Sequence, residues 1–595
     1  MRTLTKDTVG QVGQQVTVKG WVQSRRDHGG LIFIDVRDHT GIAQLVIQPE
    51  TAEAFAAAEQ LRDEFVISAS GLVRDRGEGL KNPNIPTGGI EIKVDQLTIL
   101  NRADPLPIQI HSESNEQGLS NEELRLKYRY IDLRRPKMQQ MLKKRAEYFA
   151  YMRKFMEAND FTEVATPILA NSSPEGARDF LIPSRVHAGK FYALPQAPQQ
   201  FKQLLMVGGV PRYYQLSACF RDEDPRADRL YGEFYQLDLE MSFVDDGEEV
   251  RTTTEPLIKQ LVTDFAGKKL LTEDIPRIPY VEAMEKYGVD KPDLRYGMEL
   301  IELSDALQNS GFGVFANAIK DGGAVKAICV KGASVLSRSQ IDNFTEIAKS
   351  EGAGGLAYLT FEAGEIKSPI AKFLSPEEIQ AIREKTGAAD GDIVFFGADK
   401  RPVINKVLGR LRIEFADHFK LKDPNVVALA WIVDFPFYEW DDKQNKLDFG
   451  HNPFSMPRGG VEALDAAGDS TEGRLSIVAD QYDMVANGYE VCSGGVRNHN
   501  PEVLYKVFGV LGYDSAYVDA KFGAMINAFK FGAPPHAGCA YGIDRLFMVL
   551  MNEENIREIV AFPKNGSGVD LMMNSPSPID DNQLKELSIR STAGK

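Results

Sequence analysis

Cysteine and long apolar runs are both scarce in this chain of 595 residues. The four cysteines lie far apart and form no CxxC pair: Cys219, Cys329, Cys492 and Cys539. Their spacing excludes the usual zinc motifs and a disulfide framework, so we expect reduced and mostly buried thiols. No apolar run reaches the length of a membrane span, and the first residues lack the apolar core of a signal peptide. We therefore expect a cytoplasmic protein that does not contact a membrane.

Positive charge is also in deficit. The chain has 69 Lys and Arg against 85 Asp and Glu, a formal net charge of -16 at pH 7. Non-specific binding of nucleic acid depends on summed positive charge, so this balance argues against an indiscriminate nucleic-acid-binding protein. Two basic strips remain, at Arg25-Arg26 and over residues 125–137. Each strip is about as consistent with a solvated surface as with a local contact to nucleic acid.

The first hundred residues have the pattern of a small barrel. Alternating apolar residues predict strands at 16–22, 31–37, 41–48, 65–74 and 90–100, with a helix at 51–63. Five strands with a helix after the third indicate an OB-type barrel, a fold that binds single-stranded nucleic acid. Phe33, Gln44 and a basic turn at Arg25-Arg26 suit such a role. Phe33 also fits the core, which the pattern alone slightly favours.

Two motif-rich stretches follow, separated by a glycine-rich one. The prolines of Asp104-Pro-Leu-Pro107 mark a linker, and apolar periodicity predicts a helix from Lys137 and a strand at 161–164, which Pro167 follows. Residues 285–418 contain glycine-rich breaks and few dense motifs. We interpret them as an inserted domain.

Residues 212–243 predict two antiparallel strands joined by a long charged loop. In the second strand, alternation puts Tyr235, Leu237, Leu239, Met241 and Phe243 on a core face, and Phe234, Gln236, Asp238 and Glu240 on the other. Solvent exposure explains the second face as well as a ligand does. The loop from Asp222 to Glu233 carries alternating charges, which suits a lid that holds a polyphosphate and its counterions.

A second predicted hairpin brings two carboxylates together. Asn487-Gly488 is a strong two-residue turn signal, so Val485 is expected opposite Glu490. Asp483 then lies diagonally from Glu490 on the same face, roughly 7–8 Å away at the backbone, where two carboxylates can share a hydrated divalent cation. A pair of exposed acids is the alternative explanation.

Phe220-Arg-Asp-Glu223 and, after a glycine-rich turn, Gly542-Ile-Asp-Arg545 resemble motifs 2 and 3 of class II aminoacyl-tRNA synthetases. The resemblance implies a catalytic set of Arg221, Glu223 and Arg545, in which Arg221 bridges the amino acid carboxylate and the α-phosphate of ATP. Adenine would lie between Phe234 and Arg545. The implied ATP contacts are Arg221, Asp222, Glu223, Phe234, Glu490, Gly542, Ile543, Asp544 and Arg545, with Mg²⁺ on Asp483 and Glu490. Phosphate-loop motifs and class I signatures are absent from the sequence.

Three further segments are similar to the aspartate-specific, bacterial-type members of that class: 173–180, 194–205 and 494–497. By this resemblance the L-aspartate contacts are Glu175 on the ammonium, Gln199 and Lys202 in the pocket, Arg497 on the side-chain carboxylate, and His451 and Arg221. Arginine makes a planar two-bond fit to a carboxylate, and neutral asparagine would leave the cations of Arg497 and Lys202 unpaired. These residues therefore favour aspartate over asparagine.

The barrel carries the residues that would choose the tRNA. Positions that family members use to read the anticodon are matched by Arg25, Phe33, Gln44 and Glu91. His28 and Gly79 match bacterial members that also charge the asparagine tRNA. We therefore expect charging of both the aspartate and the asparagine tRNA, with an amidotransferase acting downstream.

The resemblance covers essentially the whole chain and implies an α+β, multidomain protein. Motif 1, around Pro167, implies a homodimer. The expected parts are an OB-fold anticodon-binding domain at 1–106, a hinge at 107–135, a first part of the antiparallel-sheet catalytic domain at 136–284, an inserted α/β domain of the GAD type at 285–418, a second catalytic part at 419–562, and a C-terminal extension at 563–595.

Three departures from the family pattern and three rival interpretations remain. Asn452 replaces a common second histidine, the loop near Leu230 is one residue longer, and Cys492-Ser493 replaces part of a glycine run. The nearest rival is a strictly discriminating aspartate enzyme. An asparaginyl or lysyl relative is disfavoured by Lys202 and Arg497, since neither of those substrates carries a side-chain carboxylate. A paralogue without catalysis is disfavoured because the motif residues are all present.

Overall fold

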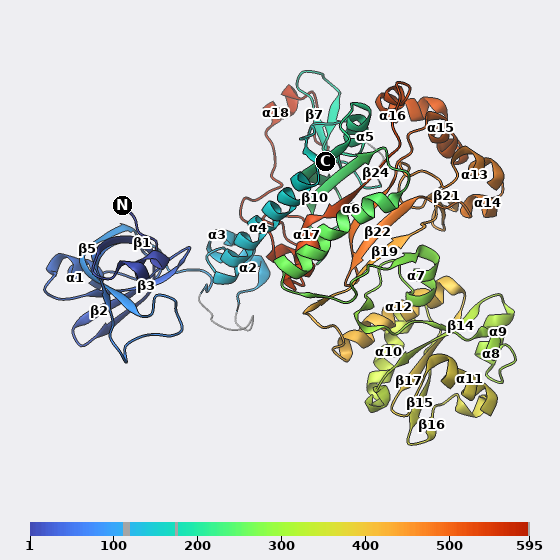
Figure 1. The fold of residues 1–595 in the computed structure, drawn as a ribbon, viewed down its shortest axis with the longest axis horizontal. Coiled ribbons are helices and arrows are strands. Elements are labelled where there is room, and N and C mark those ends of the chain that lie inside the picture. The colour runs from blue at the N-terminus through green and yellow to red at the C-terminus, as the bar shows by residue number, and fades with distance from the viewer. Residues whose placement is uncertain (111–118, 173–175, 593–595) are drawn as a thin grey trace. The chain divides into compact units, whose positions relative to one another are not determined.

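The computed structural model describes residues 1–110, 119–172 and 176–592, and by its contacts the chain divides into two compact units, Met1–Gln140 and Met141–Lys595 (Figure 1). Each unit has its own hydrophobic core. Among the described residues, no helix is both long and apolar enough to cross a membrane. The four cysteines are free and buried, as expected.

Five strands of the first unit close into a barrel in the order β1-β2-β3-β5-β4. Alternating apolar side chains point inward, and Val18, Ile34, Leu45, Ile67 and Ile92 are fully buried there. The predicted helix follows the third strand. The elements are β1 (Gln15–His28), β2 (Leu31–Asp38), β3 (Gly41–Ile47), α1 (Ala52–Glu59), β4 (Val66–Asp75) and β5 (Ile90–Asn101).

The predicted basic turn at Arg25-Arg26 is wrong. Both residues lie inside β1, which stays paired with β2 as far as His28. The turn falls instead at Gly29 and Gly30, whose φ angles of 58° and 77° are readily adopted only by glycine. Strand β1 is therefore longer than apolar alternation predicted, because its last residues are polar.

The slight preference for Phe33 as a core residue is also wrong. Ile32 and Ile34 are 2% and 0% exposed and fill the inner face of β2. Phe33 points the other way and is only half-buried. Two aliphatic side chains on one face outweigh a single aromatic one on the opposite face.

Short helices and a buried ionic cluster follow the barrel. Asp132 is fully buried and accepts hydrogen bonds from Arg129 and Arg135, each at 2.6 Å. The cluster fixes the path of the chain into the long helix that begins at Pro136. The helices are α2 (Glu122–Lys127), α3 (Arg129–Asp132) and α4 (Pro136–Ala158).

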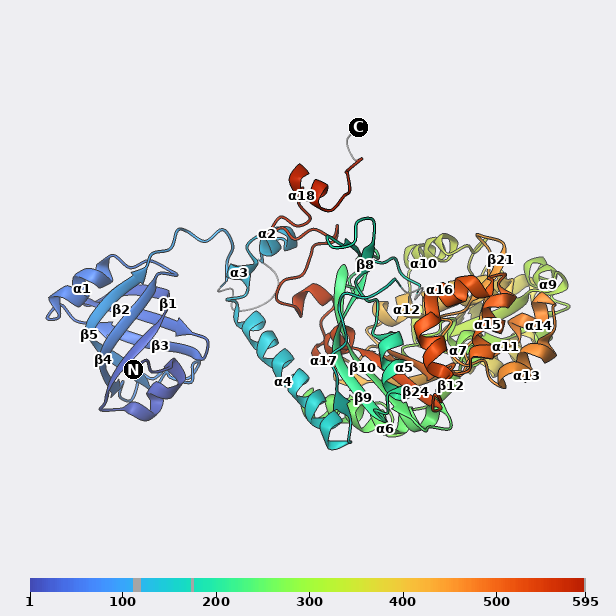
Figure 2. The ribbon, with the colours of Figure 1, turned by 90° about the horizontal axis from the view of Figure 1, so that it is seen from above.

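The second unit is built on a sheet of eight strands in the order β12-β19-β22-β23-β24-β10-β9-β6. Only the β6–β9 and β12–β19 pairs are parallel. Strands β9, β10 and β24 run side by side in Figure 2. The bounds are β6 (Thr162–Glu163), β9 (Arg212–Arg221), β10 (Gly232–Ser242), β12 (Arg277–Pro279), β19 (Leu429–Val433), β22 (Gln481–Ala486), β23 (Tyr489–Val496) and β24 (His536–Gly542).

The predicted core face of β10 is correct in the middle of the strand and wrong at its ends. Leu237, Leu239 and Met241 are buried, whereas Tyr235 and Phe243 are 42% and 77% exposed. Phe243 has a φ of 60°, so the chain turns out of the strand and the alternation stops before it. Tyr235 lies at the margin of the core, where its ring meets only the edge of a neighbouring phenylalanine.

Three helices cover the back face of the sheet and form the largest core with it. Tyr148 and Met152 of α4, Leu257 of α6 and Leu546 of α17 are fully buried there. The opposite, front face of the sheet carries the polar side chains described below. The covering helices, besides α4, are α6 (Gly247–Gln260) and α17 (Ile543–Met551).

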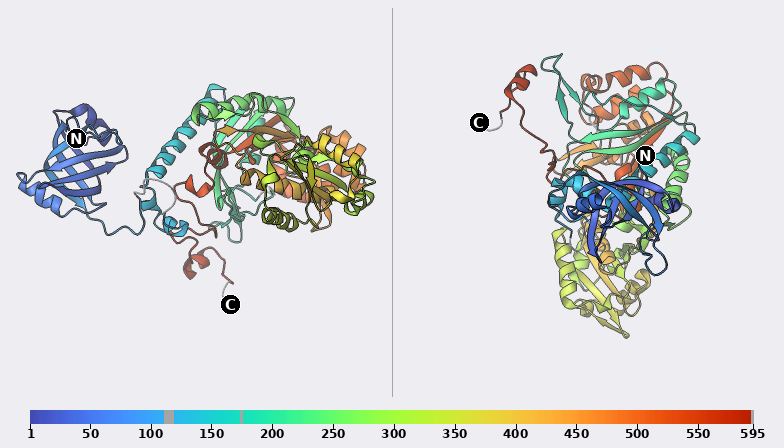
Figure 3. Two further views of the ribbon diagram at one scale, coloured as in Figure 1. Left: turned by 90° about the horizontal axis from the view of Figure 1, so that it is seen from below. Right: turned by 90° about the vertical axis from the view of Figure 1, so that its left-hand side faces the viewer.

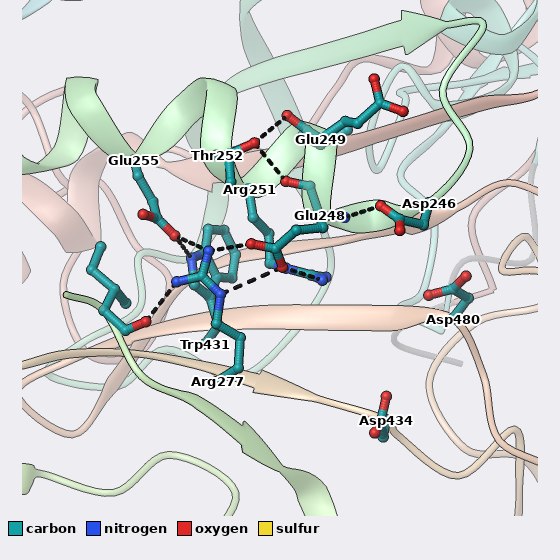
Figure 4. A network of polar contacts seen from close by, with 12 residues as sticks. Asp246, Glu248, Glu249, Arg251, Thr252, Glu255, Arg277, Trp431, Asp434 and Asp480 are labelled. Carbon is teal, nitrogen blue, oxygen red and sulfur yellow. Dashed lines mark hydrogen bonds and ion pairs between the residues drawn. The ribbon is translucent and has the colours of Figure 1, made fainter.

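A polar network ties α6 to the edge of the sheet (Figure 4). Arg277 of β12 forms ion pairs with Glu248 and Glu255 of α6. Glu255 also accepts a hydrogen bond of 2.9 Å from the indole of Trp431, a fully buried residue of β19. The network therefore joins one helix and two strands behind the sheet.

The region between β12 and β19 forms a smaller body in which helices cover both faces of a sheet. Its five strands run in the order β13-β14-β17-β15-β16. Strand β14 is buried along its whole length, because helices pack on both faces and form two separate cores. The elements are α7 (Tyr280–Tyr287), β13 (Ile301–Glu302), α8 (Ser304–Leu307), α9 (Gly313–Lys320), β14 (Ala324–Val330), α10 (Arg338–Ser350), β15 (Ala357–Glu362), β16 (Glu365–Lys367), α11 (Pro376–Thr386), β17 (Ile393–Asp399) and α12 (Arg401–His418).

The remaining elements flank the sheet and end in the segment that carries α18 (Figure 3). A separate apolar core holds the helices before β24 together. These elements are β7 (Leu181–Pro183), β8 (Phe191–Ala193), α5 (Gln199–Val207), β11 (Lys269–Leu270), β18 (Val426–Val427), β20 (Tyr438–Asp441), β21 (Lys446–Phe449), α13 (Gly460–Ala467), α14 (Thr471–Leu475), α15 (Pro501–Val510), α16 (Ser515–Phe529) and α18 (Asp581–Glu586).

Candidate functional site

A cavity of about 320 Å³ on the front face of the sheet collects most of the predicted site residues. It lies among α5, the β9–β10 loop, the β22–β23 hairpin and the junction of β24 with α17. The predicted residues that line it are Gln199, Lys202, Arg221, Glu223, Phe234, His451, Glu490, Arg497, Gly542, Asp544 and Arg545. Asp222 and Ile543 lie next to lining residues in the chain, and Asp483 follows the lining residue Gln481 by two positions, but none of the three is part of the wall. Glu175 lies outside the described residues.

A second cavity, of about 460 Å³, lies in the inserted region. Its wall is almost entirely apolar and includes Phe312, Phe315 and Phe396. A polyphosphate or a charged amino acid needs paired charges, which only the first of these two cavities offers. The candidate chemistry therefore belongs to the front face of the eight-stranded sheet.

Four buried charges cluster at the floor of the first cavity: Lys202, Asp238 and Arg497 line it, and Glu240 pairs with two of these residues without lining it. Lys202 of α5 lies 3.0 Å from Asp238 and 3.3 Å from Glu240 of β10. Arg497, directly after β23, donates from Nε and Nη2 to the two oxygens of Glu240, at 2.9 and 3.3 Å. All four side chains are at most 6% exposed. This floor therefore has two positive and two negative charges in direct contact.

Burial and pairing shift the pKa values of the two acids in opposite directions. Burial raises the pKa of Asp238 above its ordinary value, against the opposing pull of Lys202. Burial acts likewise on Glu240, but Arg497 and Lys202 together outweigh it and hold the pKa of that carboxyl below its ordinary value. Glu240 is thus the fixed anion of the floor. Asp238 also keeps one oxygen, Oδ1, without a hydrogen-bond partner among the described residues.

The sequence argument for aspartate over asparagine needs correction at this point. It assumed that neutral asparagine would leave Lys202 and Arg497 unpaired. Both cations already have carboxylate partners within the protein, Asp238 and Glu240. Arg497 keeps further N–H donors beyond the two that bind Glu240.

The opposite end of the cavity has the parts of a nucleotide site. The guanidinium of Arg221 lies 5.0 Å from the ring centre of Phe234, and its buried Nε has no hydrogen-bond partner among the described residues. Arg545 donates from Nη1 to the backbone oxygen of Glu490 at 2.7 Å. Its Nη2 lies 3.3 Å from Asp228 in the β9–β10 loop. Two arginines and one aromatic ring therefore face the same space.

The β22–β23 hairpin has the predicted turn but not the simple register. Val485 lies opposite Glu490, as predicted. A bulge then shifts the ladder, so Asp483 pairs with Ser493 and not with Cys492. A bulge adds one residue to one strand and redirects its side chains. No turn signal in the sequence specifies it.

Asp483 is buried and lacks a counter-charge. It is 4% exposed, and its Oδ1 has no hydrogen-bond partner among the described residues. Burial, and then the negative charge of Glu490, raise its pKa well above the ordinary value. A cation would relieve both effects. Within the described ranges, no three His, Cys, Asp or Glu side chains cluster as a complete metal site.

His451 and Asn452 line the wall between the two ends. Burial is the main cause that lowers the pKa of His451, which keeps the imidazole neutral at neutral pH. Asn452 accepts hydrogen bonds from the backbone N–H groups of Phe454 and Ser455 at 3.0 and 3.1 Å. The asparagine that replaces a common histidine thus caps the turn after His451.

The residues predicted to read an anticodon lie on the barrel. Phe33 of β2 pairs with Arg26 of β1, and its side chain lies on the outer face of the barrel. Gln44 of β3 pairs with Asp35 of β2 and lies on the same outer face. Glu91 is on β5, where it forms an ion pair of 2.7 Å with Arg74. Gly79 has a φ of 88° in the β4–β5 loop, and His28 ends β1.

The two neighbouring arginines of β1 differ in position. Arg26 pairs with Phe33 and shares its outer face, whereas Arg25 pairs with the inward Ile34. Arg25 donates from Nε to the carbonyl of Ala58 at 3.0 Å. Register thus groups Arg26, and not the predicted Arg25, with Phe33.

Several lining residues had no assigned role in the sequence analysis. Asp238 and Glu240 were placed on the correct face of β10, but solvent was an equal explanation for that face. Asn452, Gln481 and Ser493 also line the cavity or adjoin Asp483. Alternation could signal the first two, whereas the others come from loops and from the bulged strand, where periodicity carries no information.

Comparison with known proteins identifies relatives over nearly the whole chain. Residues 121–566 match the family model of tRNA synthetases class II (D, K and N), and residues 16–100 match that of the OB-fold nucleic acid binding domain. The aspartate–tRNA(Asp/Asn) ligase of Pelodictyon phaeoclathratiforme is 51% identical over 97% of this chain and 94% of its own. The ligase of the same name from Rickettsia bellii is 49% identical over 98% and 96%.

Solved structures share the fold at lower identity. The asparaginyl-tRNA synthetase of Pyrococcus horikoshii with asparaginyl-adenylate has a TM-score of 0.55 at 19% identity, over 95% of this chain and 98% of its own. A putative aspartyl-tRNA synthetase of Leishmania major has a TM-score of 0.57 at 17% identity, over 95% and 93%. At these identities the likeness supports the fold only.

Proposed function

The chain belongs to the tRNA synthetases of class II (D, K and N), and from this premise we propose that it activates L-aspartate with ATP and transfers it to tRNA. As a member of this family it is a ligase that forms aminoacyl-tRNA. The curated relatives at about half identity are named for aspartate and for both the aspartate and the asparagine tRNA. That agreement favours the non-discriminating enzyme over the strictly discriminating alternative.

The observation that carries the choice of aspartate is the pairing of Arg497. A guanidinium has five N–H donors and no acceptor. The bonds to Glu240 use two of these donors and leave others for a ligand. A side-chain carboxylate offers only acceptors, whereas the amide of asparagine would turn an N–H₂ donor toward donors and lose a hydrogen bond. We infer that Arg497 selects aspartate in this way.

The other substrate contacts follow from the cavity wall. Lys202, Gln199 and His451 would surround the bound aspartate. The unpartnered Oδ1 of Asp238 suits a cationic group, such as the substrate ammonium. Glu175, which resemblance assigns to the same ammonium, stays a prediction.

The nucleotide would occupy the end with the two arginines. Phe234 and Arg545 would enclose adenine, and Arg221 with Glu223 would hold the phosphates. Asp222, Glu490, Gly542, Ile543 and Asp544 complete the proposed ATP contacts. Asp483 and Glu490 suit Mg²⁺, because both are acidic and Asp483 lacks a counter-charge. Bound there, Mg²⁺ would neutralise phosphate charge.

In the first step, an oxygen of the aspartate α-carboxylate attacks the α-phosphorus of ATP. A new P–O bond forms, the bond to the β-phosphate oxygen breaks, and pyrophosphate leaves. Arg221 is placed to stabilise the negative charge that develops on the phosphoryl oxygens. In the second step, a terminal ribose hydroxyl of the tRNA attacks the activated carbonyl and AMP leaves. Correct placement of the reactants is the main contribution of the protein to this step.

We further propose that the barrel binds the anticodon through Phe33, Gln44, Glu91 and the end of β1. His28 and Gly79 support relaxed tRNA choice. A downstream amidotransferase would convert the mischarged product, and a homodimer would form through the region of Pro167. A cytoplasmic location stays a prediction.

Amino-acid-dependent ATP–pyrophosphate exchange tests the first step without tRNA. We expect exchange with aspartate and little with asparagine or lysine. Exchange with asparagine at equal efficiency would contradict the role of Arg497. No exchange with any amino acid, by a protein that binds tRNA, would favour a paralogue without catalysis.

A further inference from the structure

Three segments that are distant in the sequence meet at Tyr231. The first is Ala177–Phe180, the second is the β9–β10 loop that contains Tyr231, and the third is the Asn565–Val569 turn in the C-terminal segment. Tyr231 does not line the cavity, but the residue before it, Leu230, does.

The hydroxyl of Tyr231 fixes the residue next to the proposed phosphate clamp. It donates to Oδ1 of Asp222 at 3.2 Å. Asp222 in turn forms a β-bridge with Arg178: its N–H donates to the Arg178 carbonyl at 3.0 Å, and Arg178 Nε donates to the Asp222 carbonyl at 3.2 Å. Arg221 and Glu223, on either side of Asp222, both line the cavity. Hydrogen bonds to the main chain and to the side chain of Asp222 therefore hold the backbone between Arg221 and Glu223.

The ring of Tyr231 is held between two other segments. The ring of Phe180 meets it edge-on, with 6.1 Å between centroids. On another side lies Gly568, where an added Cβ would be 3.1 Å from three ring atoms. Gly568 has a φ of 74°, and the turn is closed by hydrogen bonds to Asn565. A glycine is thus required for the C-terminal turn to touch the ring.

A second contact joins the same two segments. The ammonium of Lys564 lies 3.7 Å from the carboxylate of Glu233, which follows Tyr231 by two residues in the chain.

The phenol of Tyr231 stays a hydrogen-bond donor at neutral pH, because burial, followed by the charge of Asp222, raises its pKa. All these contacts lie within the second unit of the chain.

We propose that Tyr231 is a positioning residue, which through Asp222 holds Arg221 and Glu223 in place for ATP and is itself held by the C-terminal turn at Gly568. This inference rests on the proposed function, because it assigns ATP to Arg221 and Glu223. It gives the C-terminal segment a part in the first reaction step, although that segment does not line the cavity.

The first test is Tyr231→Phe, which keeps the ring and removes the bond to Asp222. We expect the KM for ATP in pyrophosphate exchange to rise about three- to tenfold, as for the loss of one ordinary hydrogen bond, with little change in the melting temperature. Tyr505→Phe is a matched control, because Tyr505 also donates to a surface aspartate, Asp519, at 2.5 Å. Equal KM values for both variants and the wild type would overturn the proposal.

The second test is Gly568→Ala, which places a methyl group against the ring. Gly512→Ala is its control, since Gly512 also has a positive φ of 86° but nothing within 4 Å of an added Cβ. Both substitutions strain the backbone, and only the first displaces Tyr231. We expect a raised KM for ATP in Gly568→Ala alone. If both alanine variants behave alike, the C-terminal turn has no role in positioning.

Pyrophosphate exchange distinguishes failure of the proposed function from failure of the positioning role of Tyr231. If the wild-type protein shows no aspartate-dependent exchange, the proposed function is wrong. If the wild type exchanges normally and Tyr231→Phe matches Tyr505→Phe, only the positioning role is wrong. A lower melting temperature with an unchanged KM would likewise assign Tyr231 to stability alone.

Discussion

In the proposed function, the choice of substrate depends on Arg497 and on its pairing with Glu240. Both are buried, and the arginine holds two oxygens of the carboxylate at 2.9 and 3.3 Å. Replacement Arg497→Lys keeps the charge but removes the planar two-bond fit. We expect kcat/KM for aspartate in pyrophosphate exchange to fall about a hundredfold or more, because disruption of a buried charge pair costs ~2–5 kcal/mol.

A matched replacement tests this expectation. Arg338→Lys changes an exposed arginine that pairs with Asp342 on α10, and exchange should be unaffected. Retention of wild-type aspartate kinetics by Arg497→Lys would show that Arg497 does not contact the substrate.

The burial of Asp483 predicts that the stability of the protein depends on pH and on Mg²⁺. Burial raises its pKa in the folded state, so its favourable contribution to stability is present at low pH, below the ordinary carboxyl value of 3.8, and is lost as pH rises through the folded value. In EDTA at pH 7, Asp483→Asn should therefore melt above the wild type, by about 1 °C for each kcal/mol of relieved repulsion in a unit of this size. Added Mg²⁺ should narrow the difference, and so should acidification. A lower melting temperature of the variant in EDTA would contradict this account.

Side-chain chemistry and motif spacing in the sequence indicated several residues that the fold brings together, and their roles stay predictions. Lys202, Arg221, Arg497 and Arg545 all line one cavity. The sequence could not show that Asp238 and Glu240 pair with the cations of the cavity floor. Period-two alternation tells which face of a strand a residue is on, but not what covers that face. Phe33 was misjudged for a related reason, since only the closed barrel shows which face is inside.

At the scale of elements, the network at Arg277 should hold α6 against the sheet. Arg277→Met removes both ion pairs and leaves Glu255 with the Trp431 bond and an ion pair of 4.0 Å with Lys259. We expect a loss of about 1–3 kcal/mol in the free energy of unfolding, measured by urea denaturation. Activity should change little, because the network lies behind the sheet.

An exposed ion pair gives the comparison for this loss. Arg338→Met breaks the ion pair between Arg338 and Asp342, two side chains that are 76% and 63% exposed. Exposed pairs of this kind contribute about 0–1 kcal/mol to the free energy of unfolding. If the two methionine variants lose equal stability, the network does not anchor α6.

Local sequence also has limits at this scale. The Asn487-Gly488 signal placed the β22–β23 turn correctly, yet the bulge that pairs Asp483 with Ser493 was invisible. Strand β1 was cut short at its polar end, although it continues to His28. Strand pairing depends on backbone partners, which periodicity of side chains does not report.

At the scale of the whole molecule, the barrel and the eight-stranded sheet belong to separate units, so the two reaction steps should be separable by mutation. Phe33→Ala should lower kcat/KM for tRNA charging about tenfold or more, because a base stacked on an aromatic ring contributes ~1–3 kcal/mol. ATP–pyrophosphate exchange should not change. Phe373→Ala, at an exposed aromatic of the inserted region, is the control. A fall in exchange with Phe33→Ala would contradict separate roles for the units.

In the proposed function, this protein loads aspartate onto two tRNAs. Aminoacylation with labelled aspartate, on separate aspartate and asparagine tRNA transcripts from the same organism, tests it most directly. We predict that both are charged. Charging of the aspartate tRNA at least about a thousandfold more efficiently, a gap of ~4 kcal/mol, would contradict the relaxed choice inferred from His28 and Gly79. Charging of neither would contradict the account as a whole.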